Sequence, residues 1–398
     1  MDIDTPDIRR SGRDLLSLAL IDSRNCSLHR FSAFEASLDI PPTPELDPPL
    51  WLLGHLGWFQ EYWVARNIER HLGPYADARR PRLASIEPGA DLWYDPAQTP
   101  RAGRWRASLP PPDTVRAYLV ETLEATLDLL NHAEETDKGL YFFRLALFYE
   151  DMQGETLACM AHTLGLSVPA LQWPQPIAER SPIGFGAMRW QLGCDDGPGF
   201  VFDHEMGRHE VRVPEFEIDA QPVNWAQYAE FIEDGGYDEA SWWSAEGWAW
   251  LQATGRRAPR HVEQVRHRVL ARRGADLVQL AAQTPAMHVS WHEAQAWCRW
   301  AGRRLPSEAE WELAACTAAS RGFRWGDVWE WTSSRFEPYG DAPPGAATEA
   351  LQIPRDGSHR VLRGGSFATR WRLKHPRQRG FQRPERDDTF CGFRTCAL

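Results

Sequence analysis

The chain has 398 residues, enough for two or three domains with substantial cores. Its net charge of −11 argues against tight non-specific binding to nucleic acid, so we expect no nucleic-acid partner. Seven dispersed cysteines without a close CxxC pair favour a cytoplasmic protein with reduced thiols, and no apolar run predicts a signal segment or a membrane span.

The first 170 residues predict a bundle of four long helices. Apolar side chains recur at helical spacing within each of four stretches, and a long crossover at about 68–112 separates the second stretch from the third. Prolines within 169–182 then indicate a linker, which we place at 171–183. The four helical stretches are 12–35, 51–66, 114–133 and 140–164.

From residue 184 to residue 398 the pattern changes to short apolar runs separated by Gly, Pro and Asp. Brief helical patterns appear at 225–232, 291–301 and 308–315, and residues 343–349 are expected to form a flexible loop. Most of the 20 tryptophans fall in this half. The pattern therefore predicts a mixed α+β domain in which large aromatic groups hold irregular segments together.

Five motifs in this second half occur in a fixed order: PVNW at 222–225, GRRLPSEAEWE at 302–312, GDVWEWT at 326–332, VLRGGSF at 361–367 and GFR at 392–394. Together they resemble the formylglycine-generating-enzyme-like (sulfatase-modifying factor) domain, which has a C-type-lectin-like fold. Taken singly, the tryptophans are typical core residues and the paired glycines a tight turn.

The first half carries LGHLGWFQEYW at 53–63, which resembles the first metal-binding helix of a DinB-like bundle. A DinB-like bundle followed by this second domain is similar to the non-haem iron sulfoxide synthases of ergothioneine biosynthesis. The stretches 13–25 and 385–390 look most like the selenoneine synthase branch. The fold expected is thus a DinB-like four-helix bundle at 1–170, a linker at 171–183 and a formylglycine-generating-enzyme-like domain at 184–398.

The resemblance implies a non-haem, iron-dependent oxidoreductase. Three histidines would hold Fe(II) and leave positions open for dioxygen and a second substrate. Hercynine, the trimethylated betaine of histidine, would lie between the two domains. Its imidazole ring would be joined to a selenosugar or a thiol, giving a selenoxide or a sulfoxide.

The metal ligands of this family are only partly present. His55 matches the first histidine, whereas Tyr149 and Gln153 stand where the second and third are expected. A phenolate can bind ferric iron, but a glutamine carbonyl is a weak ligand for Fe(II). His162 follows Gln153 by nine residues, about 13 Å along a helix, and is therefore too far away to replace either ligand.

The candidate substrate-binding residues are Arg386 and Phe381, which match family positions near the betaine. Phe381 could attract a trimethylammonium group through a cation–π interaction, although core packing is the simpler interpretation. For Arg386, an ion pair with a neighbouring carboxylate is an equally good interpretation. The loop at 345–352 lacks the tyrosine that assists proton transfer in the sulfur branch, so no catalytic acid is assigned.

Three hypotheses remain at this point. The chain is an active synthase with an altered metal site, a catalytically impaired relative that binds a betaine or a partner protein, or an enzyme with a different substrate or metal. Resemblance over nearly the whole chain favours the first, and the replaced ligands at Tyr149 and Gln153 favour the second. We expect a monomer or a dimer.

Overall fold

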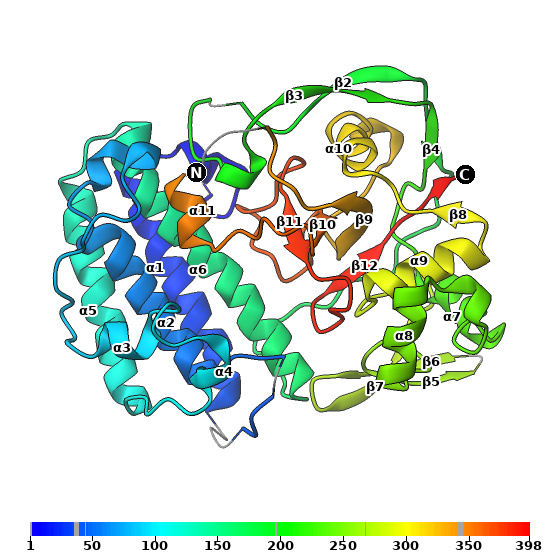
Figure 1. Cartoon of the computed structure of the whole chain (residues 1–398), viewed down its shortest axis with the longest axis horizontal. Coiled ribbons are helices and arrows are strands. Elements are labelled where there is room, and N and C mark those ends of the chain that lie inside the picture. Colours follow the sequence, from blue (N-terminus) through cyan, green and yellow to red (C-terminus); the bar gives the residue numbers. More distant parts are fainter. Residues whose placement is uncertain (1, 36–39, 44, 196, 267, 341–344) are drawn as a thin grey trace.

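The computed structural model describes residues 2–35, 40–43, 45–195, 197–266, 268–340 and 345–398. Figure 1 shows a helical bundle built from the first part of the chain beside a mixed domain built from the second. The expected architecture, a helical bundle followed by an α+β domain, is confirmed. In the part of the chain that is described, no helix is both long enough and apolar enough to cross a membrane.

The bundle consists of the four long helices that the sequence predicts. α1 packs against α6, and α2 packs against α5. The crossover between α2 and α5 carries only short helices, and α2 continues as one π-helical turn at Glu61–Ala65. The helices of this half are α1 (Arg13–Phe31), α2 (Pro49–Gln60), α3 (Ala90–Tyr94), α4 (Arg101–Arg104), α5 (Pro112–Asn131) and α6 (Asp137–Thr163).

Helix α6 is the central element of the molecule. Its first turn is stabilised by Thr136, whose hydroxyl accepts a hydrogen bond from the Gly139 amide, and by the carboxylate of Asp137 near the helix N-terminus. Most of its residues are buried on all sides. In Figure 1 it runs between the rest of the bundle and the second domain, which explains why it is not amphipathic.

The second domain is built on small sheets with short strands. One sheet has the order β1-β4-β13-β8, another the order β11-β10-β9-β12 with β12 parallel to β9, and a hairpin and a three-stranded meander complete the set. The strands are β1 (Ile183–Phe185), β2 (Met188–Leu192), β3 (His209–Val213), β4 (Phe216–Ile218), β5 (Val262–Arg266), β6 (Arg268–Arg273), β7 (Asp276–Leu280), β8 (Arg303–Arg304), β9 (Trp329–Arg335), β10 (Arg360–Arg363), β11 (Gly380–Gln382), β12 (Cys391–Phe393) and β13 (Cys396–Ala397).

Three of the helices in this domain agree with the sequence and two do not. α7, α9 and α10 each begin with a capping box, at Asn224, Ser290 and Ser307. α8 was not predicted, and α11 lies where a loop was expected at 343–349; residues 343 and 344 are outside the described part. The helices are α7 (Trp225–Glu233), α8 (Ala245–Thr254), α9 (Trp291–Trp300), α10 (Glu308–Thr317) and α11 (Ala346–Ala350).

Buried ion pairs explain why the motifs of the second half recur together. Arg394 of the GFR motif pairs with Glu330 of the WEWT motif, at 2.5 and 2.7 Å, and both side chains are fully buried. Arg363 of the RGG motif pairs with Glu312 at 3.0 Å. Because an unpaired buried charge is costly, each motif depends on its partner.

The two domains share a core. Phe200, Phe202 and Leu373, from the second half of the chain, belong to the same apolar cluster as the bundle helices, and so do Ala346 and Ala347 of α11. The cavity described next lies along this contact.

Candidate active site between the two domains

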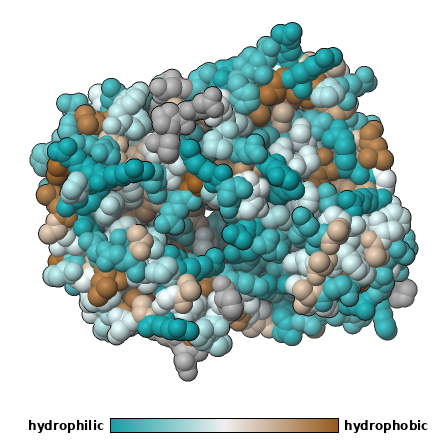
Figure 2. Space-filling model, viewed as in Figure 1, coloured by the Kyte–Doolittle hydropathy of each residue, from teal (hydrophilic) through white to brown (hydrophobic). Residues whose placement is uncertain are grey.

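A cavity of about 410 Å³ lies between the bundle and the second domain. In Figure 2 the surface is mostly hydrophilic and is hollowed near its middle, where the two domains meet. His55 of α2 and Tyr149 and Gln153 of α6 line the cavity on the bundle side. Phe381 and Arg386 line it from the second domain, so the cavity contains all five residues proposed from the sequence.

The His55 ring is fixed from several sides. It stacks between Trp51 and Trp58, which precede it by four residues and follow it by three on the same helix. Its Nδ1 lies 2.8 Å from the carbonyl oxygen of Tyr94. A carbonyl can only accept, so Nδ1 carries the proton and the lone pair is on Nε2. This tautomer suits a metal ligand.

The Nε2 lone pair of His55 is nevertheless occupied. The Tyr149 hydroxyl lies 2.7 Å from it and donates a hydrogen bond. Burial raises the pKa of the Tyr149 phenol above its usual value, so the hydroxyl keeps its proton, and burial lowers the pKa of His55 to about 4. The pair is therefore a neutral phenol bound to a neutral imidazole.

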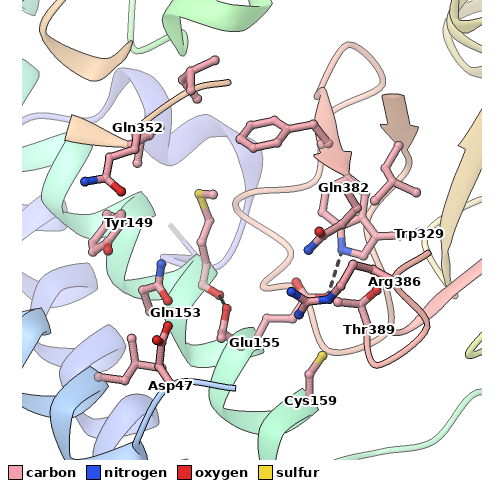
Figure 3. Close-up of a pocket in the computed structure, with 18 of the residues that line it drawn as sticks. Asp47, Tyr149, Gln153, Glu155, Cys159, Trp329, Gln352, Gln382, Arg386 and Thr389 are labelled. Carbon is pink, nitrogen blue, oxygen red and sulfur yellow. Dashed lines mark hydrogen bonds between the residues drawn. The ribbon is translucent and has the colours of Figure 1, made fainter. Parts of the chain in front are cut away.

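The residues at the family's metal position do not fit Fe(II). One imidazole lone pair is bound to a phenol proton, the phenol is not ionised, and the third position is the amide of Gln153, one helical turn along α6 from Tyr149 (Figure 3). Fe(II) sites of this kind use imidazole and carboxylate ligands. We therefore assign no reaction step to an iron ion here.

Glu155 lies two residues after Gln153 and joins α6 to the second domain. Its carboxylate accepts a hydrogen bond from Trp329 Nε1 at 3.0 Å (Figure 3). It also accepts hydrogen bonds from the hydroxyls of Ser366 and Thr369, each at 2.5 Å. Three donors satisfy this buried carboxylate without a direct cation. Glu155 thereby fixes the wall of the cavity. The sequence indicated that it lies next to the metal position but did not indicate that it links the two domains.

Arg386 and Phe381 occupy the opposite wall. The Arg386 guanidinium makes a bidentate pair with Asp388, at 2.5 and 2.6 Å, through Nε and Nη2. Phe381, on β11, packs against Phe336 with ring centroids 4.5 Å apart. Each residue thus has a structural partner and also borders the cavity, and its role in substrate binding stays a prediction.

Two further groups on the cavity wall were not singled out from the sequence. Arg104 pairs with Asp47 at 3.0 Å and covers the Trp51 ring at 3.7 Å. Gln352 follows α11 with a φ of +50° and lies on the Tyr149 side of the cavity in Figure 3. It belongs to the segment in which the family's tyrosine is missing.

The thiols of Cys159 and Cys391 also line the cavity. Burial raises the pKa of both well above the usual value, and nearby carboxylates add to the effect. They are therefore protonated thiols at neutral pH, which are poor nucleophiles and poor metal ligands.

Three histidines meet outside the cavity, at the end of α6. Among the described residues, His162, His261 and His288 form the one group of metal-ligating side chains whose ligand atoms all lie within 4.8 Å of one another. Burial lowers the pKa of all three, so the imidazoles are neutral. The distance argument correctly excluded His162 from the His55 position, but it did not reveal this second group.

Residues 20–163 match the DinB superfamily, and residues 182–327 and 324–397 match the sulfatase-modifying factor enzyme 1-like domain. The chain is similar to the hercynine oxygenase of Mycolicibacterium smegmatis, with 31% identity over 95% of this chain and 96% of that one. The chain belongs to the hercynine oxygenase family. Membership places it among the oxidoreductases, which confirms the enzyme class expected from the sequence.

Other relatives agree with this assignment. The hercynine oxygenase of Mycolicibacterium thermoresistibile is 30% identical over 95% of this chain and 94% of that one. The formylglycine-generating enzyme of Streptomyces coelicolor is 27% identical, over 48% of this chain and 80% of that one. Hercynine oxygenases thus match both domains, whereas this formylglycine-generating enzyme matches about half of the chain.

Proposed function

We propose that this chain binds hercynine in the cavity between its two domains and joins a sulfur or selenium donor to the imidazole ring. The observation that carries the proposal is the cavity itself, because its walls come from both halves of a chain whose hercynine oxygenase relatives align over almost their whole length. Its volume of about 410 Å³ lies within the range of roughly 300–1,000 Å³ that is usual for small-molecule sites.

The chemistry of the walls suits a betaine. Hercynine has a quaternary ammonium, a carboxylate and an imidazole. Phe381 offers an aromatic face to the ammonium group. Arg386 uses Nε and Nη2 for Asp388, and none of the described residues takes a hydrogen bond from its Nη1, which can therefore serve the betaine carboxylate.

The reaction that the resemblance implies balances with dioxygen as oxidant, but dioxygen reacts in this way only with a redox-active metal, which His55, Tyr149 and Gln153 as arranged here do not provide. The imidazole C–H bond and the S–H or Se–H bond of the donor break, and a C–S or C–Se bond forms. One oxygen atom of O2 goes to the chalcogen and the other leaves as water with the two hydrogens, so O2 accepts four electrons. The resemblance of the stretches 13–25 and 385–390 to the selenoneine branch favours a selenosugar as the donor.

A second candidate function is hercynine binding without oxidation. The hydrogen bond from Tyr149 to His55 favours it, because this contact fills the one imidazole lone pair that remains at the family's metal position. In that case the chain would keep the betaine site of its family and lack the iron chemistry.

Calorimetric titration of tag-free, metal-free protein tests the binding step. We expect hercynine to bind about tenfold more tightly than histidine, which lacks the three methyl groups. Phe381→Leu should remove most of this preference while the protein stays folded. If hercynine binds no more tightly than histidine, the betaine proposal is wrong.

A second experiment separates the two candidate functions. The native protein and the Tyr149→His/Gln153→His double variant are loaded with Fe(II) without oxygen, desalted, assayed for iron and then exposed to air with hercynine and a thiol or selenol donor. Product from the native protein supports the synthase reaction. Retention of about one more iron per chain than the native protein, together with product, in the double variant alone would instead establish a betaine-binding protein.

A further inference from the structure

The three histidines at the end of α6 come from separate parts of the molecule. His162 belongs to α6 and hence to the bundle, His261 lies just before β5, and His288 lies shortly before α9. We propose that these three side chains bind a divalent transition-metal ion of the zinc type that links the two domains. This proposal is independent of the one for hercynine.

The rings are already arranged around a common point. Their centroids lie 4.2 Å apart for His162 and His261, 4.8 Å for His162 and His288, and 4.7 Å for His261 and His288. Zinc–nitrogen bonds of about 2.0–2.1 Å in a tetrahedron bring ligand atoms roughly 3.4 Å apart. Ligand atoms that lie within 4.8 Å of one another can reach this arrangement by small side-chain movements.

Two of the imidazoles carry unused nitrogen atoms. Nε2 of His261 and Nε2 of His288 are buried and have no hydrogen-bond partner. Nδ1 of His288 lies 3.2 Å from the carbonyl oxygen of Asp387, to which it donates, so the lone pair of this ring is on Nε2. Metal-bound histidines are commonly oriented by such a contact on the other ring nitrogen.

The backbone points to the same conclusion. His261 has a φ of +71° and His288 a φ of +61°, in the left-handed region, which is uncommon for residues other than glycine although Asn, Asp and His enter it more often than most. Apart from glycines, only Ala170 and Gln352 among the other described residues have a positive φ. Strain of this kind persists where a side chain must point in one direction, and here it turns two imidazoles toward the same point.

His162 needs one rearrangement to join them. Its Nδ1 accepts a hydrogen bond of 3.1 Å from the Gly274 amide, so Nε2 carries the proton. Binding through Nε2 requires that proton to move to Nδ1 and the Gly274 contact to open. The loss is one hydrogen bond in the turn between β6 and β7, which is small beside a metal–imidazole bond.

Nearby charges permit a cation. Arg256 and Arg260 flank the cluster, but both pair with the carboxylate of Asp387, and Arg260 also pairs with Glu45. Arg273 lies over the Trp173 ring. The half-buried His261 leaves one side accessible to water, which can supply the fourth ligand.

The cluster is separate from the cavity, so the metal would be structural. Asp388, Thr389 and Cys391 line the cavity, whereas the carbonyl of Asp387 and the ring of Phe390 contact the histidines. The segment 387–391 therefore has the cavity on one side and the cluster on the other. A metal ion at this place would fix α6 to the second domain without meeting the betaine.

The test uses full-length, tag-free protein treated with a chelator and titrated with Co(II), then with Zn(II). We expect one ion per chain, visible d–d absorption bands typical of tetrahedral Co(II), displacement by Zn(II), and a higher unfolding temperature with metal. X-ray absorption at the zinc edge of the native protein should show three imidazole nitrogens, and this measurement needs no variant.

The matched variants are His261→Asn and His288→Asn, because Asn tolerates a left-handed backbone. Each should weaken metal binding at least about 100-fold, whereas His132→Asn, at an exposed histidine, and His55→Gln, at the family position, should retain it. The proposal is overturned if the native protein binds no ion, or if binding is lost in His55→Gln and kept in both asparagine variants. Hercynine binding to metal-free protein reports separately on the proposed function.

Discussion

At the scale of single residues, Glu293 couples the protonation of a buried carboxyl group to folding. It is the third residue of α9, where one carboxylate oxygen accepts a hydrogen bond from the Ser290 amide at 2.7 Å. The other accepts a hydrogen bond from the Tyr237 hydroxyl at 2.6 Å. Burial raises the pKa of Glu293 to about 7, and the nearby Asp387 carboxylate adds to the effect.

Glu293→Gln should remove a pH-dependent loss of stability. The native state holds the Glu293 proton more tightly than the unfolded chain, so this residue costs stability as the pH rises from about 4.5 through 7. The glutamine oxygen can still accept the hydrogen bond from the Ser290 amide, its NH2 group can donate to the Tyr237 hydroxyl oxygen, and the side chain carries no charge. We expect the free energy of unfolding of the variant, relative to native protein, to be about 1–3 kcal/mol more favourable at pH 8 than at pH 5.

Urea unfolding of metal-free protein at the two pH values gives this difference directly. If the free energies of unfolding of the variant and the native protein differ by the same amount at pH 5 and at pH 8, folding does not raise the pKa of Glu293.

The sequence could predict part of the site at this scale. The motif around His55 and the helical register of α6 placed His55, Tyr149 and Gln153 together, and all three line one cavity. The hydrogen bond between Tyr149 and His55 could not be predicted, because helical spacing gives a face and not a distance. His162, His261 and His288 share no spacing motif, so only the folded chain brings them together.

At the scale of helices, Gly54 lets α2 and α3 approach closely. A Cβ atom at this position would lie 2.2 Å from ring atoms of Tyr94. Tyr94 is buried and stacks on Tyr118, so its ring has little freedom to move. The close approach also brings the Tyr94 carbonyl to Nδ1 of His55, and the helix contact thereby sets the tautomer of that histidine.

Gly54→Ala should therefore destabilise the protein by about 2–3 kcal/mol through overpacking. Gly103→Ala is the matched control, because nothing lies within 4 Å of a Cβ atom at this position of α4. The control should change the free energy of unfolding by less than about 1 kcal/mol, toward higher stability. Denaturant unfolding compares the two, and equal effects would contradict the packing argument.

The sequence predicted best those helices whose apolar residues recur at helical spacing over several turns. The four long helices of the bundle lie close to the stretches read from the sequence, because apolar spacing persists over several turns. α8 was missed, and α11 replaced an expected loop. α11 is only five residues long, and its buried Ala346 and Ala347 are held by the bundle core rather than by a local signal.

At the scale of the whole molecule, Arg372 is the main ionic link between the domains. Its guanidinium donates two hydrogen bonds of 2.7 Å to Asp151 of α6 and one of 2.9 Å to Asp22 of α1. Its side chain is fully buried. Removing one partner of such a pair leaves an uncompensated charge in the interior, which costs far more than the pair itself contributes.

Arg372→Met should lower the free energy of unfolding by about 3–5 kcal/mol. Arg189→Met serves as the control, because the ion pair of Arg189 with Glu210 is exposed and should contribute less than about 1 kcal/mol. Calorimetry should also show whether the variant unfolds in more transitions than the native protein. If Arg372→Met lowers the free energy of unfolding no more than the control does, the ion pairs of Arg372 do not stabilise the contact between the domains.

Helix α6 also limits how this chain can change in evolution. It holds Tyr149 and Gln153 against the His55 wall, Glu155 against the second domain and His162 among the other two histidines. One residue inserted between Gln153 and Glu155 would rotate everything beyond it by about 100° and break the contacts of Glu155 and His162 at once. Substitutions in α6 are therefore tolerated more readily than insertions or deletions. Tyr149 and Gln153, which stand at the family's histidine positions with the spacing unchanged, fit that restriction.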